Sequence, residues 1–206
     1  MNAMNSDRKL QALSIAARFL LGISLGWTGM AAAADPITVN FQQQGTRLMA
    51  SGELAVPVSA ETAWEVLTDY ERVPEFVPGM RISRVVERTG DICMVEQQGE
   101  MMANNLRMFY QGVLKIIKEP PDRLSVQFVS GTFRNMQGQW TVSGKNSPVK
   151  LGYQLELDTG TPYPSPIMVA MLQQQVTLWV SSLAAEMERR PPPKPEPKPK
   201  PKRKRK

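Results

Sequence analysis

The middle of the chain contains six consecutive strand candidates whose connections are too short to hold a crossover helix. Leu124, Val126 and Phe128 alternate with polar residues, as expected for a strand with one apolar and one solvent-facing side. Turn residues rich in Gly, Pro and Asn separate the candidates, which are Arg81–Arg88, Asp91–Met102, Leu106–Lys118, Arg123–Ser130, Arg134–Ser143 and Val149–Asp158. Because parallel strands need long crossovers, these segments are predicted to form an antiparallel meander with one apolar face.

Further elements on both sides of the meander offer a partner for that apolar face. Residues 46–58 have the pattern of another strand, and Ser59 can cap a short helix that carries Glu61 in its first turn. After the meander, apolar residues recur every three or four positions between Ile167 and Arg190, at Met168, Leu172, Val176, Trp179, Leu183 and Met187. This order predicts an α+β fold in which a curved sheet packs around a long C-terminal helix.

A hollow between sheet and helix is one expected consequence of that curvature. The chain has 13 methionines, whose flexible side chains fill irregular space and adapt to varied apolar ligands. Segments 162–166 and 76–80 are predicted to gate one end of the hollow. The predicted pocket residues are Met94, Met108, Tyr110, Phe128, Trp140, Tyr153, Met168, Leu172 and Trp179. A fully packed core stays open as the alternative.

Missing residue types exclude several kinds of catalytic and metal site. The chain has no histidine, so it cannot build a Ser-His-Asp or Cys-His triad or an imidazole metal ligand. One cysteine, Cys93, allows neither an internal disulfide nor a Cys-rich zinc site, and its place in an apolar strand predicts a buried thiol. We therefore predict no metal and no cofactor.

Charge is distributed unevenly along the chain, which has a net charge of +6. Residues 1–34 carry a net +2, residues 35–188 a net −5 and residues 189–206 a net +9, which sum to +6. A nucleic-acid-binding fold normally carries its basic stripe on the domain itself. The mildly acidic middle therefore argues against nucleic acid as a partner.

The N-terminal segment has the features of a secretory signal. Arg8, Lys9 and Arg18 form a basic region, the apolar run 19–30 follows, and the small residues 31–34 offer a cleavage site. We predict a signal peptide over residues 1–34, a linker over 35–45, and export to the periplasm or another extracytoplasmic compartment. The alternative is an uncleaved membrane anchor.

The C-terminal residues 191–206 form a low-complexity tail of Pro, Lys and Arg. Proline removes amide donors and fixes φ, so this tail is predicted to be disordered and extended, without helix or sheet. Its cations, Lys194–Lys206, can contact an anionic membrane or another anionic envelope surface, at about 1 kcal/mol for each cation near such a surface. A solubilising tail without a partner is the alternative.

Two sequence motifs lie within the predicted fold. The first is VPVSAETAWEVLTDYERVPEFVPGMRISRVVERTGD at residues 56–91, and the second is GTFRNMQGQW at residues 131–140. Both resemble motifs of the START-like, helix-grip superfamily, in its branch of polyketide cyclase/dehydrase-like and coenzyme-Q-binding domains. Thr132 stands where the second motif usually has proline. The similarity spans about residues 46–188, which defines a predicted domain at 46–190. It implies a seven-stranded antiparallel sheet that grips the last helix, with a ligand tunnel between them.

The resemblance implies no single activity, because members bind lipids, quinones or polyketides, and some are cyclases or act through protein partners. An enzyme would need polar groups inside the cavity, and a desolvated carboxylate there could act as a general base. The candidates are Glu96, Glu100, Tyr110, Arg134 and Tyr153. Glu96 and Glu100 also fit the solvent-facing side of their strand. Arg134 also fits a turn brace, and the two tyrosines also fit core rings.

The leading hypothesis is an exported protein that binds or transfers a hydrophobic small molecule or lipid, such as a quinone, a lipid or a polyketide-like compound. Burial of apolar ligand surface would supply the affinity. A cyclase- or dehydrase-like enzyme that uses the same cavity is the second hypothesis. The third is a protein-interaction module whose core is packed and holds no ligand.

Overall fold

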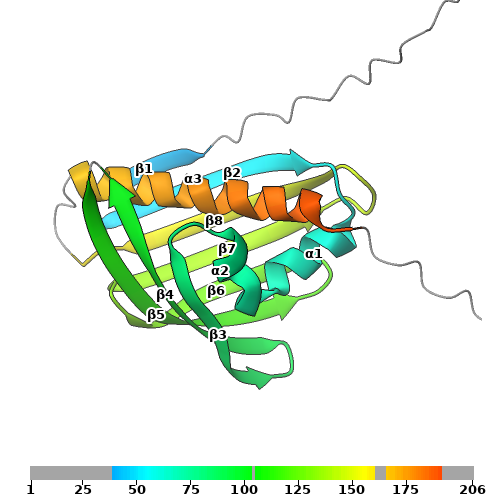
Figure 1. Cartoon of the computed structure of the whole chain (residues 1–206), viewed down its shortest axis with the longest axis horizontal. Helices are drawn as coiled ribbons and strands as arrows, with labels where there is room; N and C mark the ends of the chain where they lie inside the picture. The colour runs from blue at the N-terminus through cyan, green and yellow to red at the C-terminus, as the bar shows by residue number, and fades with distance from the viewer. Residues whose placement is uncertain (1–38, 104, 161–165, 192–206) are drawn as a thin grey trace, which may run out of the picture. The chain divides into compact units, whose positions relative to one another are not determined.

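A computed structural model describes residues 39–103, 105–160 and 166–191, and these form one curved antiparallel sheet with helices on its concave side (Figure 1). The strands are β1 Asn40–Gln44, β2 Arg47–Val56, β3 Met80–Thr89, β4 Ile92–Ala103, β5 Leu106–Glu119, β6 Arg123–Gly131, β7 Asn135–Ser143 and β8 Val149–Asp158. The helices are α1 Ala60–Thr68, the 3-10 turn η1 Tyr70–Arg72, α2 Val73–Phe76 and α3 Pro166–Arg189. The predicted α+β helix-grip fold is confirmed.

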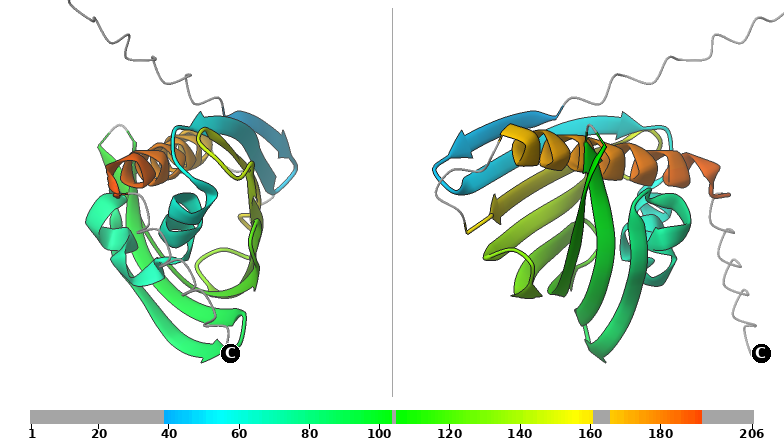
Figure 2. Two further views of the ribbon diagram at one scale, coloured as in Figure 1. Left: turned by 90° about the vertical axis from the view of Figure 1, so that its right-hand side faces the viewer. Right: turned by 60° about the vertical axis from the view of Figure 1, so that its left-hand side comes forward.

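The strand order is β1-β2-β8-β7-β6-β5-β4-β3. Strands β3 to β8 therefore form the predicted meander, and β2 pairs with β8 at its end. Between β2 and β3 the chain passes through α1, η1 and α2, which carry it from the β1–β2 end of the strand order to the edge strand β3 at the opposite end. The sheet curves around α3, with α1 lying beside that helix on the concave side (Figure 2).

The sheet has eight strands rather than the predicted seven, because β1 lies within the predicted 35–45 linker. Gln44 pairs with Arg47 across a two-residue turn, and Gly45 adopts φ 59° there, a conformation that glycine tolerates well. The strand NFQQQ has one apolar residue, Phe41, and four of its five residues are exposed. An exposed edge strand needs little apolar alternation, so the periodicity of the sequence did not reveal it.

The helix that begins after Ser59 forms as predicted. The Ser59 hydroxyl accepts a hydrogen bond from the backbone N–H of Thr62 at 3.2 Å, which satisfies one free amide of the first turn. Glu61 lies in the same turn, where backbone and Ser59 hydrogen bonds lower the pKa of its carboxyl. The buried face of α1 includes Val66 and Leu67, so this helix covers part of the sheet.

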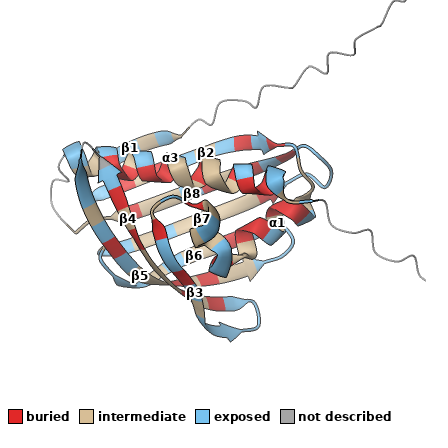
Figure 3. Ribbon diagram, viewed as in Figure 1, coloured by how far each residue is buried: buried red, intermediate tan, exposed pale blue. Residues whose placement is uncertain are grey.

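The core lies between the concave face of the sheet and α3 (Figure 3). Eight residues of α3 are buried: Met171, Leu172, Gln175, Val176, Val180, Ala184, Glu186 and Met187. Among the described residues, α3 is also the one helix long and apolar enough to cross a membrane, a test that core helices of soluble proteins pass as well. Cys93 is fully buried in β4, as expected.

A local irregularity in β5 and β6 accompanies the second sequence motif. The register shifts between Val113 and Leu114, and Gly131 has φ 144°. The backbone N–H of Thr132 donates to the Gln111 carbonyl at 2.9 Å, and its hydroxyl accepts from the Gln111 N–H at 3.0 Å. A proline could make neither bond, since it lacks both the N–H and the hydroxyl. The departure from the family motif therefore adds two hydrogen bonds between the β6–β7 turn and β5.

The predicted signal peptide, the 162–165 part of the predicted gate and the tail from residue 192 onward lie outside the described residues. The signal, the linker assignment before residue 39 and the extended tail stay predictions.

Candidate ligand cavity

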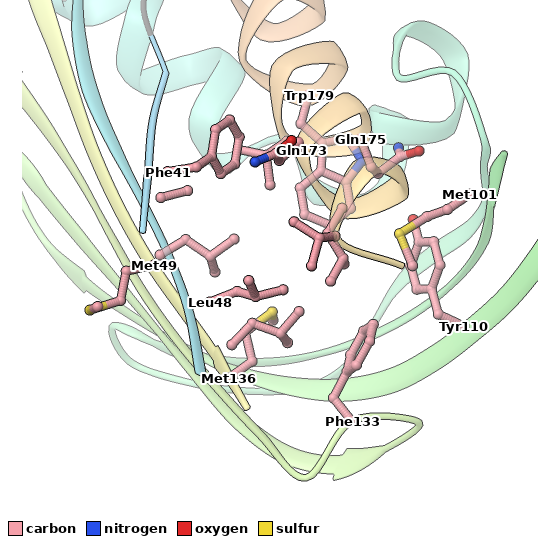
Figure 4. A pocket seen from close by; sticks show the side chains of 16 residues that line it. Phe41, Leu48, Met49, Met101, Tyr110, Phe133, Met136, Gln173, Gln175 and Trp179 are labelled. Atoms are coloured by element: carbon pink, nitrogen blue, oxygen red, sulfur yellow. The ribbon is translucent and has the colours of Figure 1, made fainter. Parts of the chain in front are cut away.

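A first apolar cavity lies between β2, the middle of the sheet and the N-terminal half of α3. It has a volume of about 40 Å³. Leu48, Met136, Phe133 and Trp179 point toward one shared space, whereas Met49 lies on the other side of its strand (Figure 4). The lining consists of Phe41, Leu48, Met49, Ala50, Met101, Tyr110, Phe133, Met136, Leu155, Leu157, Val169, Leu172, Gln173, Gln175, Val176 and Trp179. This lining is almost entirely apolar.

The second cavity is larger, with a volume of about 160 Å³, and lies closer to α1, η1 and α2. An apolar protein cavity of about this size can hold a benzene-sized ring. Its lining consists of Val66, Leu67, Tyr70, Val73, Val77, Met80, Gln97, Leu114, Ile116, Leu124, Val126, Met136, Gly138, Trp140, Tyr153, Gln154, Leu155, Val176, Trp179, Val180 and Leu183.

The two cavities share part of their walls. Met136 and Leu155 come from the sheet, and Val176 and Trp179 come from α3, and all four line both cavities. The two spaces therefore adjoin beneath α3.

Two buried polar atoms at these cavities have no hydrogen-bond partner among the described residues. They are the hydroxyl of Tyr70, in the second cavity, and the indole Nε1 of Trp179, on the shared wall. Tyr70 is only 5 % exposed. The Tyr110 hydroxyl, by contrast, makes a weak contact with the Met80 sulfur at 4.0 Å, and its ring meets Trp179 edge-on at 6.2 Å between centroids.

Burial also keeps the tyrosine hydroxyls protonated. Desolvation raises the pKa of Tyr70 and of Tyr110 well above the ordinary value of 10. It raises the pKa of Tyr153 to about 12. All three therefore remain neutral hydrogen-bonding groups near neutral pH, and none of them supplies a phenolate base.

The structure brings five of the nine predicted pocket residues to the two cavities. Tyr110 and Leu172 line the first, Trp140 and Tyr153 line the second, and Trp179 lines both. The Trp140 and Tyr153 rings pack together with 5.5 Å between centroids. Their role in binding a ligand stays a prediction.

The other four predicted residues do not line either cavity. Met108 and Met168 pack against the cluster around Met101, and Phe128 packs in the cluster around Leu114. Met94 lies on the opposite face of β4, because its neighbours Cys93 and Val95 point inward and are fully buried. Met94 therefore lies outside both cavities, because an apolar residue can also occupy the outer face of a strand.

The polar residues proposed for an enzyme are not assembled into one site. Glu96 accepts a hydrogen bond from Arg84 Nε at 2.7 Å and from Gln98 Nε2 at 2.9 Å on the outer face. The bond from Arg84 holds the pKa of this carboxyl below its usual range. Glu100 pairs with Arg81 at 2.8 Å and with Arg107 at 3.5 Å.

Arg134 is also absent from the cavities. Its side chain is exposed, and its backbone N–H donates to the Asp158 carbonyl at 3.0 Å. That bond comes from the main chain, so a bracing role for the Arg134 guanidinium stays a prediction. Of the five candidate catalytic residues, only Tyr110 and Tyr153 reach a cavity.

Sequence reasoning missed several cavity residues, with Tyr70 the most informative polar one. Tyr70 follows Val66 and Leu67 at helical spacing, a pattern typical of a packed apolar face. The strand alternation that places Cys93 and Val95 inward also places Met101 inward, and that signal could have identified Met101 as a wall of the first cavity.

A charged cluster closes the C-terminal end of α3. Glu186 is 2 % exposed and accepts hydrogen bonds from Arg189 Nε at 2.7 Å and Arg190 Nε at 2.9 Å. Arg190 Nη2 in turn donates to Asp69 at 2.7 Å. Burial alone would raise the pKa of Glu186, but the hydrogen bonds from the two arginines outweigh it and lower that pKa. The cluster joins α3 to the chain just before Tyr70.

The described residues contain no group of three or more His, Cys, Asp or Glu side chains placed to hold a metal ion. Neither cavity wall contains an Asp, Glu, Lys or Arg among the residues that the structure covers. What these walls offer chemically is apolar surface, amide groups and neutral hydroxyl and indole groups.

Solved structures with the same fold include lipid-transfer and cyclase proteins. The Zhui aromatase/cyclase of a Streptomyces species superposes with a TM-score of 0.61 at 14% identity, covering 70% of this chain and 95% of that one. A STAR-related lipid transfer protein from Xanthomonas axonopodis gives 0.60 at 17%, covering 77% and 97%. A START superfamily protein from Mycobacterium smegmatis gives 0.57 at 18%, covering 68% and 97%.

These identities are low, so the superpositions establish the fold alone. No curated protein sequence matches the chain. The sequence model of one family, described as polyketide cyclase/dehydrase and lipid transport, matches residues 56–182, which is more than half of the chain. The chain therefore belongs to this family and has the START-like helix-grip fold.

Proposed function

We propose that this protein is an exported carrier that binds a hydrophobic small molecule or lipid between its sheet and α3. The observation that supports this most directly is the pair of adjoining apolar cavities, whose described walls contain no charged side chain. Apolar ligand surface buried there contributes about 25 cal/mol per Å². The family includes lipid transport, which agrees with a carrier.

The geometry favours carriage over catalysis. A general base in the cavity would need a carboxylate or another titratable group of suitable pKa within reach of the substrate. Glu96 and Glu100 lie on the outer face in arginine pairs, and burial raises the pKa of Tyr110. An enzyme of the cyclase type would therefore have to work through neutral groups.

A membrane surface is the proposed source or destination of the ligand. Met102, Leu106 and Phe109 on the β4–β5 hairpin are exposed, Phe109 by 58 %. Met102 directly follows the cavity residue Met101, and Phe109 directly precedes Tyr110. These apolar side chains can enter a lipid surface beside the first cavity.

Charge on the same hairpin complements an anionic lipid surface. Arg81 lies over the Phe109 ring, with 5.2 Å from the guanidinium carbon to the ring centroid. Arg81 and Arg107 share one carboxylate, that of Glu100, which leaves a net positive charge at this position. The basic tail, outside the described residues, adds further cations to the same proposed contact.

Extraction of the purified full chain, followed by mass analysis, tests the carrier proposal. We expect an apolar molecule to copurify, and we expect the protein to take up the neutral dye Nile red when it has been emptied. A bare chain in native mass spectrometry that also takes up no dye would contradict the proposal.

Flotation with vesicles tests the membrane part separately. The full chain should bind vesicles that contain an anionic lipid and should lose binding as salt rises, because surface charges are screened. The variant Phe109→Ser should bind these vesicles less, and deletion of residues 191–206 should remove most of the salt-sensitive part. Dye uptake should persist in both variants. Equal binding to neutral and anionic vesicles would argue against this contact.

A further inference from the structure

The two unpaired polar atoms at the cavities carry information about the ligand. Folded proteins rarely leave a buried polar group without a hydrogen bond, because burial removes water that would otherwise satisfy it. Tyr70 is nine-tenths buried or more, and its hydroxyl has no partner among the described residues. The Trp179 side chain is only partly buried, and its ring lies edge-on to Tyr110, but its indole nitrogen is also buried without a hydrogen-bond partner among the described residues, on the wall between the cavities.

The chemistry of these two groups limits what can complement them. An indole N–H only donates, so its partner must be an acceptor. A tyrosine hydroxyl donates or accepts, and burial raises the pKa of Tyr70, so that the hydroxyl keeps its proton near neutral pH. An oxygen atom with free lone pairs satisfies either group. A purely hydrocarbon ligand satisfies neither.

The absence of charge on the described cavity walls limits the ligand further. No Lys or Arg among the described residues lines either cavity. A carboxylate or phosphate held there would lose its hydration without gaining a counter-charge, and such burial is strongly unfavourable. The buried part of the ligand should therefore be neutral.

We propose that the ligand is an uncharged, mainly apolar molecule with at least one carbonyl-type oxygen, which receives a hydrogen bond from Tyr70 or Trp179. This inference rests on the proposed carrier function and narrows it to a chemical class. The oxygen would lie under α3 if it meets Trp179, or beside η1 if it meets Tyr70. Apolar side chains would surround the rest of the molecule.

Competition against bound Nile red tests the proposed chemical class of the ligand with three probes of equal chain length. The probes are a long-chain methyl ketone, the corresponding n-alkane and the corresponding fatty acid at a pH where it is ionised. For the full chain we expect the ketone to displace the dye at about a three- to tenfold lower concentration than the alkane, the range expected for one buried neutral hydrogen bond. The fatty acid should compete least well.

Conservative variants then identify the donor. Tyr70→Phe removes one oxygen, and Trp179→Phe removes the indole N–H while keeping an aromatic ring. The ketone-to-alkane ratio is defined as the alkane concentration that displaces half of the dye divided by the ketone concentration that does so. At least one of the variants should lower this ratio, and the double variant should bring it to about one. Tyr70→Phe should also raise the thermal unfolding midpoint of the emptied protein, because it removes a buried hydroxyl that has no partner. If Trp179→Phe does not fold, the wild-type ratio and Tyr70→Phe decide the question.

Several outcomes would overturn the proposal. Equal competition by ketone and alkane, or a ratio that survives in the double variant, would show that neither group contacts a ligand oxygen. The fatty acid as the best competitor would contradict a neutral ligand. An unchanged midpoint in Tyr70→Phe, together with a ratio near one in the wild type, would assign a water molecule to the hydroxyl. If the protein takes up no dye at all, the carrier function itself fails, which separates the two results.

Discussion

Two neighbouring polar regions of the interior are built in opposite ways. At the C-terminal end of α3, Glu186 receives hydrogen bonds from Arg189 and Arg190, and Arg190 also reaches Asp69. The next residue along the chain, Tyr70, has a buried hydroxyl without a partner among the described residues. The charged groups of the first region find their hydrogen-bond partners within the protein. The Tyr70 hydroxyl gains a partner only if a ligand or another molecule enters the cavity.

This difference separates polar groups that stabilise the fold from polar groups that can contact a ligand. The charged cluster joins α3 to the segment before η1, so its groups stabilise the fold. The unpaired polar atoms at the cavities lower the stability of the emptied protein, and their presence can be understood through a ligand. Removal of a polar group should therefore change the free energy of unfolding in opposite directions in the two regions. It should lower that free energy at Glu186 and raise it at Tyr70.

The largest effect is expected for Glu186→Gln. The substitution weakens charge-assisted hydrogen bonds from two arginines, and we expect it to lower the free energy of unfolding by about 2–3 kcal/mol. Chemical denaturation at neutral pH measures this loss. Glu188→Gln is the matched control, because Glu188 is exposed on the same helix. A Glu186→Gln variant as stable as this control would show that the charged cluster does not stabilise the fold.

The same pair of variants gives a pH test of known sign. The folded-state pKa of Glu186 is lowered from its ordinary value of 4.5. Its contribution is therefore fully present above about pH 4.5 and is lost as the pH falls through the folded-state pKa. The stability difference between wild type and Glu186→Gln should shrink on acidification below pH 4.5, whereas a difference that grows there would contradict the assigned ion pairs.

The parts that sequence reasoning predicted are those governed by periodicity. Alternation located the six meander strands, and the stripe from Met168 to Met187 located α3. The Ser59 cap followed from local chemistry. These features depend on a few adjacent residues, so they can be recognised without knowledge of long-range contacts.

The cavity was only partly predictable, for a physical reason. An inward residue that fills the core and one that lines a hollow have the same sequence pattern. Met108 and Phe128 face inward yet lie in packed clusters and line neither cavity, whereas Tyr70, in the same cluster as Phe128, also lines the second cavity. Whether a polar atom finds a partner depends on residues far along the chain, as the Arg190–Asp69 pair shows.

A glycine on β4 determines whether the first cavity keeps its shape. A Cβ added at Gly99 would lie 2.5 Å from the Tyr110 hydroxyl and 2.6 Å from the Gly79 carbonyl oxygen. Gly99→Ala must therefore move Tyr110 and the backbone, and we expect it to cost about 2 kcal/mol and to weaken dye uptake. Denaturation and dye titration measure both effects. At Gly138 the nearest atom lies at 3.3 Å, so Gly138→Ala should cost less stability. Gly138 also lines the second cavity, so it is the control for denaturation and not for dye uptake.

Filling the shared wall should separate ligand binding from folding. Val176 lines both cavities, and Val176→Phe adds a ring to that space. We expect the affinity for Nile red to fall at least about tenfold, which corresponds to about 1.4 kcal/mol, because the ring occupies the volume that the dye needs. Val86→Phe is the control, since Val86 is exposed on β3. Undiminished dye affinity in a folded Val176→Phe protein would place the dye outside these cavities.

The smallest effects are expected on the outer face, where the carboxylates already have partners in contact with water. Glu96→Gln weakens one ion pair with arginine and Glu100→Gln weakens two. Solvent screens these pairs, so we expect both variants to fold normally. Nile red affinity should change less than twofold, because neither residue lines either cavity. Dye titration of the double variant checks this. A large loss of dye binding would place the ligand contact on the outer face. It would then be wrong that groups paired within the protein only stabilise the fold and that the unpaired groups contact the ligand.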